Sequence, residues 1–447
     1  RCEKAMTGVL RPVTALLLAT AILMLGGGLQ SVLLPLRAQM EGFSDLQIGV
    51  FGSAYFLGQL AGCMFAPVVI GRVGHIRAFA AFSAVAATIP LLHAIVVEPI
   101  AWTILRLVSG AVLAGVFLVI ESWLSAASDQ ETRGRVLGAY TLIHLLLVMA
   151  GMQLISVKSP EEFELFSLVA VMFSLAAVPI ALTATIAPVP PRRTKLRIGW
   201  LFYISPAAWL AAFLTGITNG AIWMMFPIYA KGIGFETSEV AVFMATAVLA
   251  GAVAQWPIGS LSDRFGRRVF LAGGALVSAA FGIALVATRS DQTTLLYAFV
   301  AVFGAASFPL YTLALAHAND LVNKRRAVEV AGGLLLIFSI GAVIGPIISS
   351  AAMGVLGPSA LFATTALFHI LLVAAVMVRV QVRPRIPTRH KEDFVMIPRT
   401  TPAVYELDPR TDATVEVPEP EQPEPAPVAD PEPQEETSLD TVAPQAV

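Results

Sequence analysis

Long uninterrupted runs of apolar residues are the feature that most limits how this chain can fold. Twelve runs can be drawn, each of about 20 residues, the length a helix needs to cross a hydrocarbon layer of ~30 Å. They are continuously apolar, whereas a strand of a membrane barrel alternates over about ten residues. They therefore predict an all-α membrane protein. The predicted spans are residues 12–36, 46–70, 78–97, 101–124, 136–157, 163–187, 206–230, 239–262, 269–288, 293–318, 328–352 and 359–379.

Composition excludes several other classes of protein. Of the 447 residues, 57% are hydrophobic and 13% are charged, against about 25% charged residues in soluble domains. The net charge of −1 offers no overall field for nucleic acid, so no such partner is expected. Cys2 and Cys63 have no metal-ligand spacing, and we expect neither a metal nor a cofactor. Because the chain has no phosphate-binding G-x-x-x-x-G-K-[ST] loop, Ser/His/Asp set or HExxH motif, we expect no enzyme.

Lysine and arginine are concentrated in alternate loops, 14 in one set and 4 in the other. Basic residues favour the cytoplasmic side, so both termini are predicted to be cytoplasmic, as an even number of spans requires. We expect a monomeric multi-pass protein in the lipid bilayer of the bacterial inner membrane. The richer set comprises Arg72, Arg77, Arg133, Arg135, Arg192, Arg193, Lys195, Arg197, Arg264, Arg267, Arg268, Lys324, Arg325 and Arg326.

The two halves of the chain resemble each other in sequence. Residues 28–51 align with residues 220–243 at a shift of 192, and Arg72-Val73-Gly74 then falls on Arg264-Phe265-Gly266. Such a repeat predicts two pseudo-symmetric six-helix bundles, a known plan for transporters. The recurring residues are Gly28, Pro35, Ala38, Gly42, Phe43, Val50 and Phe51, which match Gly220, Pro227, Ala230, Gly234, Phe235, Val242 and Phe243.

Five segments follow from these patterns. We expect a cytoplasmic N-terminal segment (1–11), a first bundle (12–188), a cytoplasmic linker (189–205), a second bundle (206–380) and a cytoplasmic tail (381–447). The linker is Pro-rich and then basic. The tail begins basic, which suits anionic headgroups, and from residue 411 it has eight prolines, ten acidic residues and no Lys or Arg. That composition predicts disorder, with a partner-binding tail as the alternative.

The loop after the eighth span contains the most specific motif. Residues 259–268 read GSLSDRFGRR, which is similar to the G-x-x-x-D-R-x-G-R-R signature of the major facilitator superfamily. The resemblance implies a loop whose charge pairs differ between the outward- and inward-open states; the alternative is a basic loop that only sets topology. The first-half copy lacks the aspartate. The predicted switch residues are Gly259, Asp263, Arg264, Gly266, Arg267 and Arg268, with Arg72 and Gly74 in the first half.

Further segments carry the same resemblance. Arg106 and Gly110 in the fourth span resemble the family's R-x-x-x-G segment, which implies a role in proton coupling or conformational exchange. The alternative for Arg106 is snorkelling to the outer interface. The sequences Glu-Ser-Trp-Leu (121–124) and His-Ala-Asn-Asp (317–320), with the glycine-proline run at 341–346, resemble the YcaD-like branch of bacterial permeases.

Ionisable groups near the inner ends of the spans are the coupling candidates. A carboxyl group in the place of Glu121, removed from water, can load and release a proton. The alternative for Glu121 is an ion pair with an inner-side cation: Arg72, Arg77 or Arg133. Asp320 has a similar interpretation, although we expect it at the water interface. His317 can change charge near neutral pH or serve as a neutral hydrogen-bonding group.

A solute cavity is predicted near the midplane, between the two halves. The resemblance implies that the first, fourth, seventh and tenth spans line it. The alternative for each polar residue there is hydrogen bonding between helices. The solute-cavity candidates are Gln30, Asn219, Trp223 and Tyr311, followed by Tyr55 and Gln59 of the second span.

These features together predict a secondary active transporter. We expect it to move a small solute across the inner membrane by rocker-switch alternating access, with protons as the coupled ion. Two alternatives are a uniporter of the same fold and a non-transporting membrane receptor or scaffold that uses the acidic tail.

Overall fold

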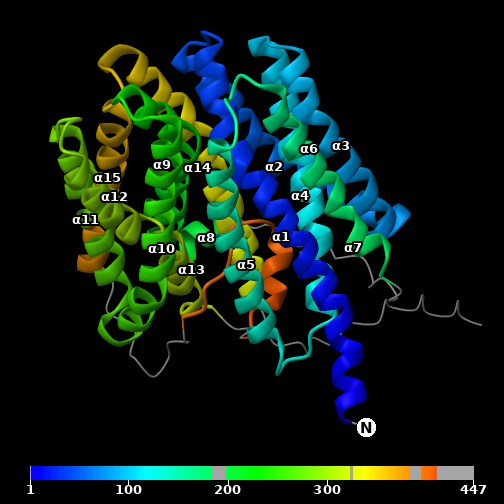
Figure 1. The fold of residues 1–447 in the computed structure, drawn as a ribbon. Helices are drawn as coiled ribbons and strands as arrows, with labels where there is room; N and C mark the ends of the chain where they lie inside the picture. The colour runs from blue at the N-terminus through cyan, green and yellow to red at the C-terminus, as the bar shows by residue number, and fades with distance from the viewer. Residues whose placement is uncertain (1, 184–197, 323–325, 383–393, 410–447) are drawn as a thin grey trace, which may run out of the picture. The chain divides into compact units, whose positions relative to one another are not determined.

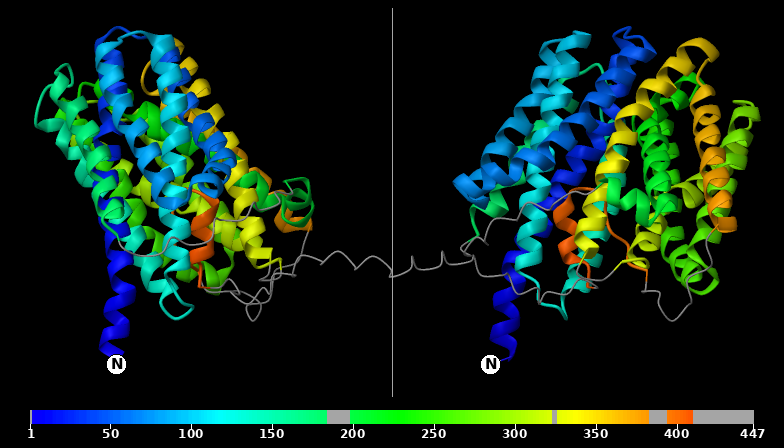
Figure 2. Two further views of the ribbon diagram at one scale, coloured as in Figure 1. Left: turned by 90° about the vertical axis from the view of Figure 1, so that its right-hand side faces the viewer. Right: turned by 180° about the vertical axis from the view of Figure 1, so that it is seen from behind.

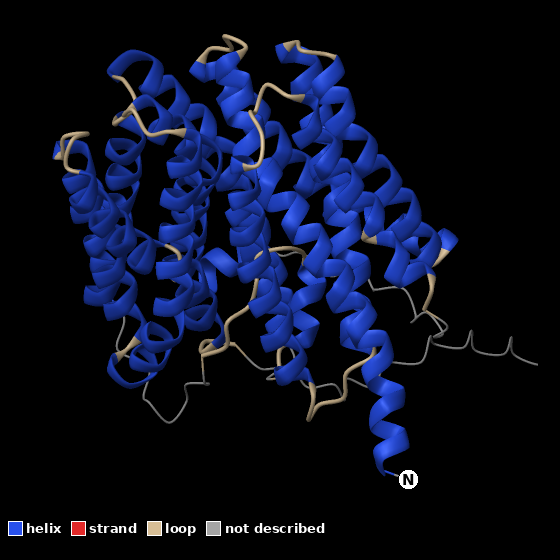
Figure 3. Ribbon diagram, viewed as in Figure 1, coloured by secondary structure: helices blue, strands red, loops and turns tan. Residues whose placement is uncertain are grey.

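The structure is a computed structural model that describes residues 2–183, 198–322, 326–382 and 394–409. The chain divides into a unit of Arg1–Asp412 and a unit of Ala413–Val447, and every described residue belongs to the first. Within these ranges the regular structure is helical, without strands (Figure 3).

The first half consists of long helices packed side by side (Figure 1). Their apolar faces lie against protein or lipid. The segments are helical because no water is present at that depth to hydrogen-bond an exposed backbone. In order they are α1 (Cys2–Met40), α2 (Asp45–Val73), α3 (His75–Ile95), α4 (Pro99–Ala126), α5 (Arg133–Gln153) with η1 (Leu154–Ser156), and α6 (Phe163–Leu175) continued by α7 (Ala177–Ala181).

The second half repeats this arrangement after a short helix, α8 (Ile198–Ile204), and Figure 2 shows both halves from two further sides. It ends in a short 3-10 helix, η4 (Pro402–Leu407). The long helices are α9 (Pro206–Gly232), α10 (Thr237–Phe265), α11 (Arg267–Ala287), α12 (Thr293–Ser307) continued by α13 (Leu310–Asn319), α14 (Ala327–Leu356) and α15 (Ala360–Val382).

Twelve helical segments in the described ranges are long and apolar enough to cross a membrane, from Val13–Met40 to Ala360–Val378. The predicted all-α class with twelve spans is therefore confirmed. The helices run past several predicted ends: the predicted span 46–70 lies within Asp45–Val73, and the predicted span 328–352 lies within Ala327–Leu356. Polar end turns continue the helix into the interface, so hydropathy alone places the ends too early.

The sequence repeat is visible in the backbone. Gly42 and Gly234 have φ of +79° and +100°, Gly74 and Gly266 have φ of +83° and +113°, and each pair is separated by 192 residues. Glycine adopts positive φ without a Cβ clash, so these turns depend on it. Helix α2 follows Gly42 and helix α10 follows Gly234, and both helices begin with a capping box, at Ser44 and at Glu236.

Glycines also allow matching helices in the two halves to touch. A Cβ on Gly28 would lie 2.1 Å from the carbonyl oxygen of Val148, where α1 meets α5. At the equivalent crossing of α9 and α14, a Cβ on Gly220 would lie 2.4 Å from the carbonyl oxygen of Ala342. Small residues at such crossings let backbones approach, and this packing accounts for the glycine-rich run in α14.

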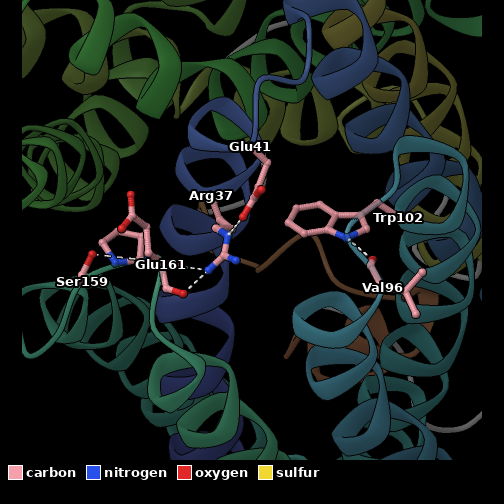
Figure 4. A network of polar contacts seen from close by, with 7 residues as sticks. Arg37, Glu41, Val96, Trp102, Ser159 and Glu161 are labelled. Atoms are coloured by element: carbon pink, nitrogen blue, oxygen red, sulfur yellow. Dashed lines mark hydrogen bonds and ion pairs between the residues drawn. The ribbon is translucent and has the colours of Figure 1, made fainter.

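Polar contacts at the end of the bundle opposite the N-terminus tie helix ends to loops (Figure 4). Arg37 Nε lies 2.6 Å from Glu41 Oε1, and Arg37 also donates to the carbonyl oxygens of Pro160 and Glu161 in the loop before α6. Trp102 Nε1 donates to the carbonyl oxygen of Val96 at 2.8 Å. These bonds satisfy backbone carbonyls that the turns leave without a helical partner.

The predicted segment boundaries stay predictions. Helix α8 lies in the predicted linker (189–205), and residues 189–197 of that linker are outside the described part of the chain. Of the predicted tail (381–447), the structure describes two helical residues and residues 394–409. We call residues 394–409 the C-terminal segment.

Candidate functional site

A cavity of about 280 Å³ lies between the two halves, close to the lower end of the range for small-molecule sites. Helices α1, α2, α4, α5 and α6 line it from the first half, and α9, α10 and α14 from the second. Residues 396–400 of the C-terminal segment complete the wall. Of the predicted solute candidates, Gln30, Tyr55, Gln59, Asn219 and Trp223 line the cavity, whereas Tyr311 lies beside it.

The amides in this wall have different surroundings. Gln30 is 4% exposed, and its Nε2 has no hydrogen-bond partner in the part of the chain that the structure describes. Asn219 Nδ2 donates to the carbonyl oxygen of Thr215 at 2.9 Å within its own helix. Since buried amides normally find partners, Gln30 offers a donor to a bound molecule, whereas the amide oxygen of Asn219 accepts from Arg399.

Arg106 lies in the cavity wall. It is 8% exposed, and its guanidinium carbon lies 4.2 Å from the centre of the Tyr55 ring, which is cation–π geometry. The Nε of Arg106 has no hydrogen-bond partner among the residues that are described. Arg106 thus lies against the cavity and the Tyr55 ring, and its role in proton coupling or conformational exchange stays a prediction.

Glu121 is fully buried, and hydroxyl groups surround its carboxylate. Tyr140 Oη donates to Glu121 Oε1 at 2.7 Å, and the hydroxyls of Thr400 and Thr401 donate to its two oxygens. These contacts do not include an ion pair with Arg72, Arg77 or Arg133, which was the alternative. On one helix, 15 residues span about 22 Å, so Glu121 and Arg106 do not meet.

The predicted switch loop forms an ion-pair network. Arg267 Nη1 lies 2.8 Å from Asp263 Oδ1, and Arg267 Nε lies 2.5 Å from Asp320 Oδ2. The side chains of Arg267 and Asp320 are each 1% exposed, so Asp320 is not at the water interface as expected. Here one arginine at the start of α11 joins the end of α10 to the end of α13.

The other predicted switch and coupling residues lie around this network. Arg268 Nε donates to His317 Nε2 at 3.3 Å, so His317 belongs with the switch loop and not with Glu121. Arg264 is exposed, as is Arg72 of the first half. Gly259 contacts the C-terminal segment: a Cβ there would lie 2.1 Å from Phe394 Cδ1. The backbone N–H of Phe394 also donates to Asp263 Oδ2 at 3.1 Å.

The C-terminal segment supplies site residues that the sequence does not predict. Arg399 Nη1 donates to Asn219 Oδ1 at 3.2 Å, and Gln59 Nε2 donates to the carbonyl oxygen of Thr400 at 3.4 Å. Tyr405 Oη lies 2.8 Å from Tyr311 Oη. Burial raises the pKa of Tyr405 well above its ordinary value, which keeps this phenol neutral. Composition is the sequence signal that could have identified this segment. It has apolar and aromatic residues to bury, unlike the tail beyond residue 411.

In the part of the chain that the structure describes, twelve apolar helices in two related halves with a cavity between them have the architecture of a helical membrane transporter. The family model of the Major Facilitator Superfamily matches residues 208–407. An MFS-type transporter YcaD of Escherichia fergusonii is 30% identical over 338 residues, which are 75% of this chain and 87% of the relative. That of Salmonella typhimurium is 29% identical over 345 residues, 77% of this chain and 88% of the relative. The chain belongs to the major facilitator superfamily.

Solved structures show the same fold. A variant of the nucleoside transporter NupG has a TM-score of 0.69 at 16% identity and covers 82% of this chain and all (100%) of its own. A bacterial homologue of the human lysosomal transporter Spinster, inward-facing and unoccupied, has a TM-score of 0.69 at 16% identity over 84% of this chain and 98% of its own. As a member of this family, the chain is a multi-pass inner-membrane transporter and not an enzyme.

Proposed function

We propose that the chain is a secondary active transporter that moves a small solute by rocker-switch alternating access. Its driving ion is the proton, and Glu121 is the residue that binds it. The distribution of basic loops supports cytoplasmic termini, so Glu121 lies toward the cytoplasmic ends of the spans.

The hydroxyl surroundings of Glu121 carry this proposal. A carboxylate accepts from hydroxyls, and a protonated carboxyl can donate to one of them, because a hydroxyl both donates and accepts. Tyr140, Thr400 and Thr401 can therefore bond to Glu121 in either protonation state. An arginine partner would favour only the charged state. An acid of this kind within a span is a functional candidate by its position alone.

Thr400 connects the acid to the cavity. Its side chain contacts Glu121, and the residue itself lines the cavity. A change of protonation at Glu121 would therefore alter the polar groups that a solute meets. The ion-pair network on Arg267 supports rocker-switch alternating access. Rocking the two halves must rearrange ion pairs between helix ends, such as that of Arg267 with Asp320.

The test begins with a thermal-stabilisation screen of the purified full chain, which identifies a solute. Uptake of that solute into proteoliposomes is then measured with and without a pH gradient of one unit. One proton per solute can support about tenfold accumulation for each pH unit. We expect Glu121→Gln to lose this accumulation, whereas the matched control Glu131→Gln, an exposed carboxylate in the loop after α4, keeps it.

Each contrary result has a distinct meaning. Equal uptake with and without the gradient would contradict proton coupling and favour the uniporter. Failure of every stabilising solute to cross would favour the receptor or scaffold.

A further inference from the structure

The C-terminal segment occupies one side of the cavity that the proposed function assigns to the solute. Helix η4 packs against α4, α5 and α14, as the right-hand view of Figure 2 shows in orange. Its residues Ala403, Val404, Tyr405 and Leu407 are buried, and so are Ile397, Thr400 and Thr401 before them. The chain thus fills part of its own binding site.

Arg399 lies in a cage built by three different helices. Its guanidinium carbon is 5.2 Å from the centre of the Phe338 ring on α14 and 5.9 Å from that of the Tyr311 ring on α13. Asn219 on α9 accepts a hydrogen bond from Nη1 at 3.2 Å. Both ring distances are within the ~6 Å of a cation–π contact. Two aromatic faces and an amide oxygen form a site for an organic cation.

The ring partners are themselves held in place. The rings of Tyr311 and Phe338 pack edge to face with centroids 4.9 Å apart. Asn219 is fixed by its bond to Thr215 at 2.9 Å. These contacts use groups within α9, α13 and α14, and Tyr311 is also held by its bond to Tyr405, which Arg399→Ala leaves in place.

A polar path continues from the cage into the first half. The residue after Arg399, Thr400, contacts Glu121 through its hydroxyl and Gln59 through its carbonyl oxygen. Thr401 contacts Glu121 as well. A cation with a hydroxyl or amine a few bonds away would find the same partners, and it would bridge both halves as Arg399 and Thr400 do.

We propose that the cavity binds small organic cations bearing a guanidinium or ammonium group in the cage of Phe338, Tyr311 and Asn219, and that Arg399 competes for this cage as a tethered ligand. The proposal rests on the proposed function, because it takes this cavity as the solute site. A tethered group acts at an effective concentration of order millimolar. A free cation must therefore displace Arg399, and its apparent affinity is lowered by the fraction of cages that Arg399 fills.

The test measures binding of butylguanidinium to the full chain in detergent by titration calorimetry. Butylurea, which is neutral and nearly isosteric, is the matched ligand. We expect Arg399→Ala to bind butylguanidinium about tenfold more tightly than the wild type, and butylurea not to bind. Adding Phe338→Ala to Arg399→Ala removes the gain. Arg289→Ala, which deletes an exposed arginine, leaves the affinity unchanged.

Three outcomes would overturn the proposal. They are equal affinity of Arg399→Ala and the wild type, equal binding of butylurea and butylguanidinium, and no binding to any variant. A folding defect is separated from these by Arg399→Gln, which keeps a polar side chain and must show the same gain. The binding measurement needs no gradient and no membrane. If butylguanidinium does not bind, the proposed transport of another solute is unaffected. If butylguanidinium binds but no solute is taken up, the proposed transport is contradicted and the proposed cation site is not.

Discussion

Arg267 and Asp320 form a buried ion pair across the second half, with Nε and Oδ2 2.5 Å apart and both side chains 1% exposed. The pair joins the first residue of α11 to the residue that caps the C-terminus of α13. Arg267 belongs to the basic loop that the sequence motif predicts. Asp320 is predicted only as a coupling candidate, and the pair connects the two.

Removal of the acid should destabilise the transporter. Asp320→Ala leaves a buried guanidinium with less compensation, which costs about 3 kcal/mol. The measurement is the apparent unfolding temperature in detergent. The control is Asp291→Ala, which breaks an exposed contact with Arg289 at 3.6 Å and should have no measurable effect. Equal shifts for both variants would contradict a structural role of the pair.

The crossing of α2 and α4 should not tolerate a methyl group. A Cβ on Gly110 would lie 2.0 Å from the carbonyl oxygen of Tyr55, so the backbones must separate. We expect Gly110→Ala to lower the free energy of unfolding by about 3 kcal/mol, measured as thermal stability in detergent. Gly138→Ala, where no atom lies within 4 Å, should be neutral or slightly stabilising. The prediction fails if Gly110→Ala is equally well tolerated.

The docking of the C-terminal segment should depend on Gly259. A Cβ there would meet the Phe394 ring at 2.1 Å and push it aside. We expect about tenfold faster tryptic cleavage after Arg399 in Gly259→Ala, because overpacking of 1–3 kcal/mol raises the undocked fraction. Gly273→Ala adds a Cβ in open space on α11 and is the control. Unchanged cleavage in both variants would mean that the Phe394 contact does not hold the segment.

Docking should also weaken as the pH rises above the ordinary carboxyl range. Burial raises the pKa of Glu406 above its ordinary value of 4.5, and Arg133 opposes this. Above pH 4.5 the docked segment therefore holds more protons than the free one, and linkage makes docking less favourable until the raised pKa is passed. Hydrogen exchange of residues 394–409, corrected for the intrinsic rate at each pH, measures this.

The matched variant for the pH dependence is Glu406→Gln, which should remove the part of the slope that Glu406 contributes. If the variant and the wild type show the same slope, Glu406 is not responsible, and another group must titrate.

Much of the fold could be predicted because hydropathy and turn chemistry are local. A helix across lipid must be apolar over its whole length, and a tight turn with positive φ must contain glycine. Gly42, Gly74, Gly234 and Gly266 therefore mark equivalent turns in the two halves of the sequence. The predicted cavity residues Gln30 and Asn219 are polar residues on spans that the family resemblance assigns to the cavity, and both line it.

The partners of the charged residues could not be predicted. One of the two interpretations of Glu121 is an ion pair with a cation of a neighbouring loop, yet its carboxylate binds threonines 279 and 280 residues further along the chain. Arg106 has an aromatic ring as partner and not an acid. A contact over such a separation leaves no local pattern in the sequence, because any of several polar groups could satisfy the same buried atom.

The sequence by itself determined the twelve spans, the repeat of 192 residues, the basic loop after α10 and the position of Glu121 inside the fourth span. Those features depend on how each residue interacts with lipid, water and its own backbone. Only the tertiary structure decided that the C-terminal segment enters the cavity, that Arg399 lies between Phe338 and Tyr311, and that hydroxyls surround Glu121. Docking of that segment depends on surfaces that exist only after both six-helix bundles have packed.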